Sequence, residues 1–354
     1  METDYIIVGQ GIAGSILAFT LLKEGKRVLV VDANPTFSSS KVAAGLYNPI
    51  VFKRIVRSWM VDDLLPIADL VYAEMELLLQ QKFHYKRPIV KLFSTEEEKN
   101  FWKEKSAIPS LIPYLSNQLD LNFQQEKLVA EFGVSSVMQS GNIDVPLMLG
   151  NFQKYLLRER SLIIESFNYD DVTITTEGVK WKGNTAKKII FCEGHQSTQN
   201  PYFKWLPFVL TKGEILTVKI ENFEKDAVVN KGVFILPLGN DLYRIGATYE
   251  WKDLSETLSQ KGKSELIDKL CKILKIPFDV IDHQAGIRPT VIDRRPIIGL
   301  HPEFQQIGIF NGMGTKAVMI APYFAREFYN YLEGSCSLHK EVCIERFYKY
   351  KKDC

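Results

Sequence analysis

The stretch "YIIVGQGIAGSILA", residues 5–18, contains three glycines in the spacing G-x-G-x-x-G: Gly9, Gly11 and Gly14. The apolar, β-branched run Tyr5–Val8 before them predicts a buried strand. The residues after them, Ser15–Lys23, carry apolar side chains at helical spacing, and Gly25 is typical of a helix end. A glycine pattern alone is common, so this strand–turn–helix context carries the interpretation.

A second predicted strand, "RVLVVDA" (Arg27–Ala33), delivers Asp32 at its end and completes a βαβ unit with a dinucleotide fingerprint. Gly9 permits the tight turn, Gly11 lets the backbone approach a pyrophosphate, and Gly14 lets the helix lie close to the strand. The helix N-terminus offers N–H groups to the phosphates. Asp32 can accept hydrogen bonds from both hydroxyls of an adenosine ribose. The alternative is a structural glycine turn without a ligand.

The composition excludes several classes of protein. The chain has 354 residues, 46% of them hydrophobic, and a net charge of +2, so no basic surface indicates nucleic acid. The sequence contains no run of eighteen apolar residues, so we expect no transmembrane helix. We also expect no secretory signal. The five histidines form no metal-ligand pattern, so we expect no metal. The scattered cysteines predict a reduced, cytoplasmic setting: Cys192, Cys271, Cys336, Cys343 and Cys354.

The next segment, "SSSKVAAGLYNPI" (Ser38–Ile50), combines hydroxyls, a lysine and small residues. A flat, phosphate-bearing ligand could lie against such a backbone. Composition alone leaves equally open a serine-rich loop that leads into a helix. The last ten residues, "ERFYKYKKDC" (345–354), are polar and basic and predict a solvated tail.

Several stretches in order resemble the D-amino-acid oxidase family of FAD-dependent oxidoreductases, which includes glycine oxidase and sarcosine oxidase. "SSKVAAG" is similar to the second flavin-binding segment of that family. The other stretches are "IIFCEGH" (Ile189–His195), "VFILPLGNDLYRIGATYE" (Val233–Glu250), "AGIRPTVIDRRPIIG" (Ala285–Gly299) and "GIFNGMGTKAVMIAP" (Gly308–Pro322). Together they span almost the whole chain.

The resemblance implies an α/β fold: a Rossmann-like, doubly wound FAD-binding domain and a second domain built on a large mixed, mainly antiparallel sheet. We expect the FAD-binding domain at 1–80, 141–200 and 286–354, and the substrate-binding domain at 81–140 and 201–285. The residues agree, because strand patterns cluster in the middle with a helix pattern after them: Glu214–Ile220, Gly232–Leu238, Leu242–Tyr249, a hairpin turn at Leu238–Asp241 and a helix at Ser264–Lys275.

The resemblance also implies FAD as the cofactor and assigns residues to it. The segment Arg295–Gly299 contains no cysteine, whereas sarcosine oxidases tether their flavin to a cysteine there, so we expect FAD to be held non-covalently. Cys192 is expected to be buried packing. The expected cofactor-binding residues are Gly9, Gly11, Ile12, Ala13, Gly14, Asp32, Ser39, Ser40, Lys41, Ala43, Ala44, Gly45, Tyr169, Glu193, Gly194, Gly312, Met313, Gly314, Thr315 and Lys316.

Arg288, in "GIRPT", is the main candidate for substrate binding. A guanidinium in an apolar neighbourhood needs an anionic partner. In the resembling oxidases the arginine of this motif binds the substrate carboxylate, and the alternative is a salt bridge to Asp282 or Asp293. We interpret Arg294 and Arg295, which follow in the same segment, as two exposed charges in a turn.

The loop "NGMGTK" (Asn311–Lys316) precedes an apolar helix, so its N–H groups and Lys316 would place positive charge at the flavin pyrimidine edge. The alternative is an ordinary helix start. Phe234 and Thr315 fall where glycine oxidase has a tyrosine and an arginine, which makes glycine itself a doubtful substrate. The hydroxyls that could compensate are those of Tyr249, Tyr47 and Tyr243.

The segment "NPIVFKRIVRSW" (Asn48–Trp59) carries Lys53, Arg54 and Arg57. We expect a helix with Lys53 and Arg57 on one solvated face, the alternative being a basic rim for an acidic substrate. His283 lies near the arginine motif and is expected to be structural.

The predicted reaction is oxidation of the C–N bond of an amino acid or related amine, with hydride transfer to flavin N5 and hydrolysis of the imine. The substrate region would include Arg288, Tyr249 and Phe234, with O2 or a quinone as electron acceptor. The alternatives are oxidation of a glycine-like side chain on a modified tRNA uridine, a hydroxy-acid or glycerophosphate oxidase, a nicotinamide-dependent dehydrogenase, and a flavin-binding scaffold without activity.

Overall fold

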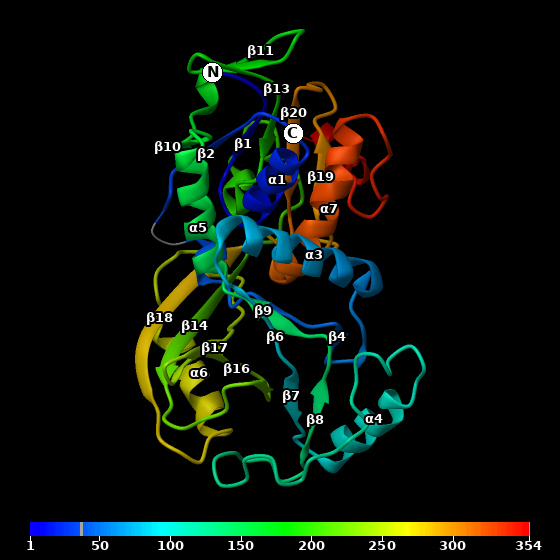
Figure 1. The fold of residues 1–354 in the computed structure, drawn as a ribbon, viewed down its shortest axis with the longest axis vertical. Coiled ribbons are helices and arrows are strands. Elements are labelled where there is room, and N and C mark those ends of the chain that lie inside the picture. The colour runs from blue at the N-terminus through cyan, green and yellow to red at the C-terminus, as the bar shows by residue number, and fades with distance from the viewer. Residues whose placement is uncertain (36–37, 354) are drawn as a thin grey trace.

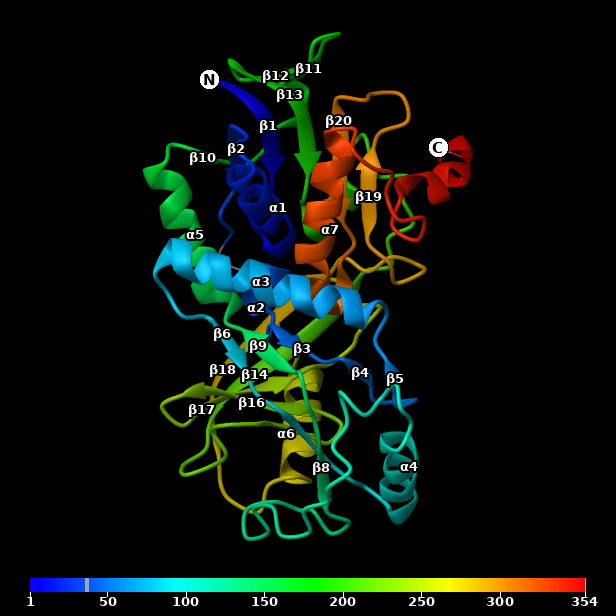
Figure 2. The same cartoon turned by 45° about the vertical axis from the view of Figure 1, so that its right-hand side comes forward.

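The computed structural model describes residues 1–35 and 38–353, so Cys354 lies outside the described residues. Two large β-sheets lie one above the other, and the longer helices pack around the upper sheet (Figures 1 and 2). Both chain termini lie at the upper end. The predicted combination of a Rossmann-like part and a second, mainly antiparallel part is confirmed.

The upper sheet has eight strands in the order β10-β2-β1-β13-β12-β11, with β20 beside β13 and β19 beside β20. The strands β10, β2, β1, β13 and β20 run parallel, as the βαβ pattern predicts. The bounds are β1 Glu2–Val8, β2 Val28–Asp32, β10 Leu162–Ile164, β11 Val172–Ile174, β12 Val179–Trp181, β13 Asn184–Phe191, β19 Ile297–Leu300 and β20 Ile307–Asn311.

The two faces of this sheet are covered differently. Tyr5 and Ile7 of β1 pack against helices, whereas Ile6 and Val8 face a second apolar cluster that contains Trp205. The helices are α1 Ile12–Lys23, α2 Ser39–Val42, α3 Val61–Leu79, α4 Glu96–Ser106, α5 Val145–Arg158, α6 Gln260–Cys271 and α7 Ala317–Leu332. Among them α1 and α7 lie side by side on the sheet, and α3 crosses below them (Figure 2).

The lower sheet has seven strands in the order β18-β14-β17-β16-β15-β7-β8, and only β15 and β7 pair in parallel. The predicted hairpin at Leu238–Asp241 joins β16 to β17. Helix α6 packs on the face that is turned away from the upper sheet. The bounds are β7 Ile89–Leu92, β8 Val134–Val137, β14 Thr211–Lys219, β15 Val228–Asn230, β16 Phe234–Gly239, β17 Leu242–Gly246 and β18 Asp279–Arg288.

The prediction of a helix around Lys53 and Arg57 is wrong. The segment is a hairpin of β4 (Ile50–Val51) and β5 (Val56–Arg57), and Ile55 between them is buried with φ of 45°. Lys53 and Arg54 are exposed at its turn. A small sheet nearby contains β3 Leu46–Tyr47, β6 His84–Lys86 and β9 Gly141–Ile143.

The solvated tail predicted at the C-terminus is also wrong. Residues Ile344–Asp353 form a 3₁₀ helix, η4, in which Ile344 and Phe347 are buried in the second apolar cluster. Arg346 anchors the segment through Asp293 (Nε to Oδ2, 2.8 Å) and the carbonyl of Pro296. The remaining 3₁₀ helices are η1 Tyr169–Asp171, η2 Gly194–Thr198 and η3 Gly314–Lys316.

The division into domains at 1–80, 141–200 and 286–354 against 81–140 and 201–285 stays a prediction. The strands of the two large sheets follow it, except that β18 of the lower sheet continues to Arg288, beyond the expected boundary at 285. Among the described residues, no helix combines the length and the apolar character needed to cross a lipid bilayer.

Candidate functional site

A cavity of about 1280 Å³ lies between the two large sheets, which is ample for a dinucleotide and a small substrate together. It is lined by almost all the residues selected from the sequence for FAD and substrate. Gly14 and Gly312 are the exceptions. A Cβ on Gly14 would lie 1.8 Å from the carbonyl oxygen of Gly9, so Gly14 shapes the turn behind the cavity.

The glycine turn and the serine segment form one wall of the cavity. A Cβ on Gly11 would lie 2.9 Å from Oγ of Ser40, so a larger residue would fill the space that the turn leaves open. The Ser40 hydroxyl accepts from the N–H of Ile12 at 3.1 Å. The start of α1, with its free N–H groups and partial positive charge, faces the same space. The arrangement suits a pyrophosphate.

Asp32 is oriented by two backbone donors at the end of β2. Its Oδ2 accepts from the N–H of Gln10 at 2.7 Å, and its Oδ1 accepts from the N–H of Asn34 at 2.6 Å. Each carboxylate oxygen has further lone pairs for a ligand in the cavity. These bonds fix the carboxylate where a ribose diol can meet it.

Glu193 is a partly buried acid just beyond the end of β13. Its oxygens accept from the hydroxyl of Tyr169 at 2.6 Å and from Nδ2 of Asn200 at 2.8 Å. Burial raises the pKa of Glu193 to about 7 despite these bonds. The carboxyl can therefore be neutral near pH 7, which reduces its repulsion of an anionic ligand.

Lys316 stands at the start of α7, and its ammonium is hydrogen-bonded to the hydroxyl of Ser58. Ser58 in turn donates to the carbonyl of Asn48 at 3.0 Å. Burial lowers the pKa of Lys316 from its usual 10.5 to about 8, so the side chain is still protonated at pH 7. The helix N-terminus and this ammonium together give one end of the cavity a positive potential.

Arg288 projects into the cavity from the end of β18 without a carboxylate partner. No carboxylate in the described part of the chain lies within 4.0 Å of its guanidinium, so the salt bridge to Asp282 or Asp293 is excluded. Its Nη1 donates to the carbonyls of Thr248 (3.3 Å) and Lys212 (3.5 Å). Burial lowers the pKa of Arg288, but an arginine stays protonated. Its positive charge is available to an anion.

The aromatic residues expected near the substrate divide into two groups. Phe234 and Tyr249 line the cavity, and the guanidinium of Arg288 lies 4.6 Å from the centre of the Tyr249 ring. The hydroxyl of Tyr47 instead bonds Nε2 of His84 at 2.9 Å, and Tyr243 is buried on the opposite face of its sheet. Neither Tyr47 nor Tyr243 can replace the phenol that Phe234 lacks.

Other expectations near the site have mixed outcomes. His283 is structural, because its Nε2 pairs with Glu214 at 2.7 Å. Cys192 is buried and lines the cavity just beyond β13. Arg295 is not simply exposed, since it pairs with Glu341 at 2.8 Å and packs on the ring of Trp59 at 4.4 Å.

The sequence-based set lacks several polar side chains that line the cavity, among them Arg244 and Gln284. Arg244 on β17 donates Nη1 to the carbonyl of Ala43 at 3.0 Å, and its Nε has no partner among the described residues. Within the same described part of the chain, Oε1 of Gln284 on β18 is unpaired. The alternation of Arg244 with buried Tyr243 and Ile245 was the available signal, because it places Arg244 on the opposite face from the core.

The residues present fit FAD. The glycine turn leaves space that a Cβ would fill, Asp32 is oriented for a ribose, and the start of α7 supplies positive charge for the flavin. Such a donor set accommodates a dinucleotide with an electron-accepting ring.

Comparisons with known proteins identify the family. The family model for FAD dependent oxidoreductases (DAO) matches residues 4–330. Glycine oxidase of Geobacillus kaustophilus (strain HTA426) is 21% identical over 90% of each chain. The tRNA 5-methylaminomethyl-2-thiouridine biosynthesis bifunctional protein MnmC of Legionella pneumophila (strain Corby) is 26% identical over 86% of this chain, which spans only 47% of that relative.

Solved structures share the fold over nearly the whole length. The crystal structure of glycine oxidase from Geobacillus kaustophilus superposes with a TM-score of 0.80, 20% identity and 96% coverage of both chains. The crystal structure of iminodiacetate oxidase from Chelativorans sp. BNC1 superposes with a TM-score of 0.76 and 16% identity, and the match covers 97% of this chain and 98% of that one. The chain therefore belongs to the DAO family and is a FAD-dependent oxidoreductase.

Proposed function

We propose that the protein oxidises the C–N bond of an amino acid or a related amine whose carboxylate is bound by Arg288. The observation that carries this proposal is the guanidinium in the cavity, which donates to two carbonyls but has no carboxylate partner among the described residues. A partly buried cation without a counter-ion costs free energy that an anionic substrate would offset. Its planar fork suits a carboxylate, which it can bind through two parallel hydrogen bonds.

In this reaction the substrate carbon loses a hydride and the nitrogen a proton, a C=N bond forms, and water hydrolyses the imine to a carbonyl compound and ammonia or, from a secondary amine, a primary amine. When bound, FAD supplies the acceptor of the electron pair, at N5. Arg288 orients the substrate, Tyr249 packs against the Arg288 guanidinium, Phe234 gives the cavity an apolar side chain, and Lys316 with the start of α7 holds positive charge nearby. We propose O2 or a quinone as the final electron acceptor.

The proposed FAD contacts are with Gly9, Gly11, Asp32, Ser40 and the segment up to Gly45. The described cysteines are unpaired, which supports a reducing, cytoplasmic setting. A panel of amino acids, amines and hydroxy acids, mixed anaerobically with the holoenzyme, tests the proposal: amino acids should bleach the flavin.

We expect FAD to be released without covalent attachment, because the stretch Arg295–Gly299 holds no cysteine and the thiol of Cys192 is buried with a raised pKa. Acid precipitation should leave the yellow colour in the supernatant. Colour that remains in the washed pellet would contradict this expectation.

Lys316→Met is expected to lower the reduction potential of the bound flavin, because a positive charge beside the reduced, anionic ring is lost. The pKa of Lys316 is lowered to about 8, and by linkage the anionic reduced ring raises it again, so above about pH 8 the wild-type potential should fall with pH more steeply than that of the variant. Dye-linked potentiometry between pH 6 and 10 measures the potential of the variant and the pH dependence of the wild-type potential. Potentials that coincide for wild type and variant at pH 7 would exclude a role for this charge.

A second candidate is oxidation of a glycine-like side chain on a modified tRNA uridine, which the 26% identity to MnmC favours. That relative is about twice as long as the matched region, and the net charge of +2 favours tRNA binding less than a strongly basic chain would. Bleaching of the flavin by under-modified tRNA, but not by free amino acids, would support this candidate over the first.

A further inference from the structure

A loop of thirteen residues, 247–259, connects β17 to α6 and runs along the cavity. Tyr249 and Glu256 of this loop are among the lining residues, and Glu256 comes within 4.0 Å of Nε2 of His195 on the opposite side. Most of its side chains are exposed. The loop therefore has little apolar packing of its own, and polar contacts must hold it in place.

A buried lysine on β14 makes the central contact. The side chain of Lys212 is 1% exposed, and its Nζ donates to Oδ2 of Asp253 at 2.7 Å and to the carbonyl of Thr257. Its main chain also pairs with Glu250 in both directions, at 2.9 and 3.0 Å. Lys212 thus binds the loop at three positions.

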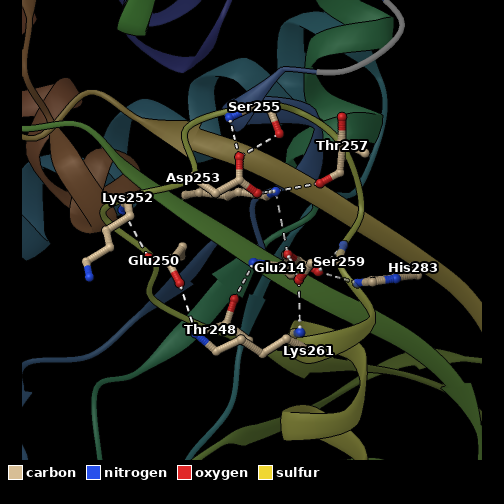
Figure 3. A network of polar contacts seen from close by, with 12 residues as sticks. Glu214, Thr248, Glu250, Lys252, Asp253, Ser255, Thr257, Ser259, Lys261 and His283 are labelled. Carbon is tan, nitrogen blue, oxygen red and sulfur yellow. Dashed lines mark hydrogen bonds and ion pairs between the residues drawn. The ribbon is translucent and has the colours of Figure 1, made fainter.

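The end of the loop is held by a second buried charge. Glu214 accepts from Oγ of Ser259 at 2.7 Å, and Ser259 also caps the first turn of α6. Nζ of Lys212 lies 3.7 Å from Oε1 of Glu214, so the two charges offset each other. In Figure 3, Asp253, Thr257 and Glu214 are joined to one nitrogen, the Nζ of Lys212, and Ser259 lies beside Glu214. We call Lys212, Glu214, Asp253, Thr257 and Ser259 the Lys212 cluster.

Arg288 depends on the elements that this cluster joins. Its guanidinium donates only to the carbonyls of Lys212 and Thr248 among the described residues, and it packs against the Tyr249 ring. A Cβ on Gly213 would lie 1.9 Å from Nη2, so the guanidinium also rests directly on the backbone of β14. Every one of these neighbours belongs to β14 next to Lys212 or to the start of the loop.

We propose that Lys212 and Asp253 are positioning residues for carboxylate binding. Thr248 and Glu250 are bonded directly to β14, and the ion pair fastens the part of loop 247–259 that follows them, so that the Tyr249 ring stays packed against Arg288 and orients it. This inference rests on the proposed function, because it assumes that Arg288 binds the substrate carboxylate. The Lys212 hydrogen bond also holds the pKa of Asp253 well below its usual value, so the pair remains ionised at neutral pH.

The test compares Asp253→Ala with wild-type holoenzyme. Asp253 is half-exposed, so its removal should leave the fold and the FAD content intact. Titration with benzoate, followed by the flavin absorbance, should show affinity reduced by about 10-fold to 100-fold, since a displacement of ~1 Å in a positioned group has effects of this size. Binding of benzamide, which lacks the charge, should change by less than about threefold, because the guanidinium contributes little to it.

A second readout follows the loop itself. Trypsin should cleave the Asp253→Ala holoenzyme after the exposed Lys252 faster than it cleaves wild type, because the loop opens more often. Lys212→Met should give the same two changes. Lys261→Ala is the matched control, since Lys261 pairs with Glu250 of the same loop at 3.1 Å but is exposed and outside the cavity. It should behave as wild type does.

Arg288→Lys in the same titration separates the possible failures. If Arg288→Lys loses benzoate affinity while Asp253→Ala keeps it, the positioning role is wrong and the proposed function stands. If Arg288→Lys binds benzoate as wild type does, the proposed function fails, and the positioning role fails with it. If Asp253→Ala loses benzoate and benzamide equally, the Lys212 cluster supports the fold of the cavity and does not position Arg288.

Discussion

Arg288→Lys is expected to keep its FAD and to bind a carboxylate-bearing substrate about 30-fold to several thousandfold more weakly. Loss of a desolvated, two-pronged contact costs about 2–5 kcal/mol, and about 1.4 kcal/mol corresponds to a factor of ten. Lysine preserves the charge but not the planar fork that rests on Gly213 and Tyr249. The rate of flavin reduction against substrate concentration measures this loss.

Arg294→Lys is the matched control for this prediction. Arg294 is exposed, lies six residues further along the chain and does not line the cavity. Its substitution should leave the concentration dependence unchanged. An Arg288→Lys variant with the same dependence as wild type would show that this arginine is structural.

Asp32→Ala should lose most of its affinity for FAD. Two ribose hydroxyls lose a charged acceptor, and such hydrogen bonds contribute about 1.5–3 kcal/mol each. The N–H groups of Gln10 and Asn34 also lose the oxygens that now accept from them, so the turn beneath the cofactor relaxes. Titration of the apoprotein with FAD, followed by quenching of flavin fluorescence, measures the affinity.

Asp4→Ala separates loss of FAD from loss of the fold. Asp4 is a carboxylate on β1 at the opposite end of the same sheet, where it accepts from the N–H of Arg27 at 2.9 Å. Its removal should lower thermal stability without weakening FAD. Equal affinities for FAD in Asp32→Ala and wild type would contradict the assignment of Asp32 to the ribose.

The sequence predicted the βαβ unit well because local spacing determines it. The run Tyr5–Val8, the glycine turn and Asp32 lie within about thirty residues, and each requirement is visible in the residue types. The resemblance to a family supplied the rest of the cavity, including Phe234 and Lys316 from segments far apart in the chain.

The errors arose where tertiary contacts override local pattern. The spacing of Lys53 and Arg57 suits a helix, but burial of Ile55 at positive φ produces a hairpin. The polar C-terminal segment is held because Arg346 meets Asp293, some fifty residues earlier. Neither contact is visible in a local window of sequence.

The Lys212 cluster could not be predicted for a similar reason. Lys212 and Asp253 are forty-one residues apart, and only the pairing of β14 with the start of loop 247–259 brings them together. For Tyr243 the alternation along β17 separates it from Arg244, but which strands lie beside it became known only with the register of the sheet. Strand register depends on the whole sheet, not on the strand alone.

Anaerobic reduction of the holoenzyme by matched pairs of compounds tests the central claim most directly. Each pair is an amino acid and the amine that remains when its carboxylate is removed. We predict that at least one amino acid bleaches the flavin absorbance and that its amine partner does so far more slowly at the same concentration. Amines that bleach the flavin as fast as their amino acids, or bleaching by hydroxy acids alone, would contradict the account.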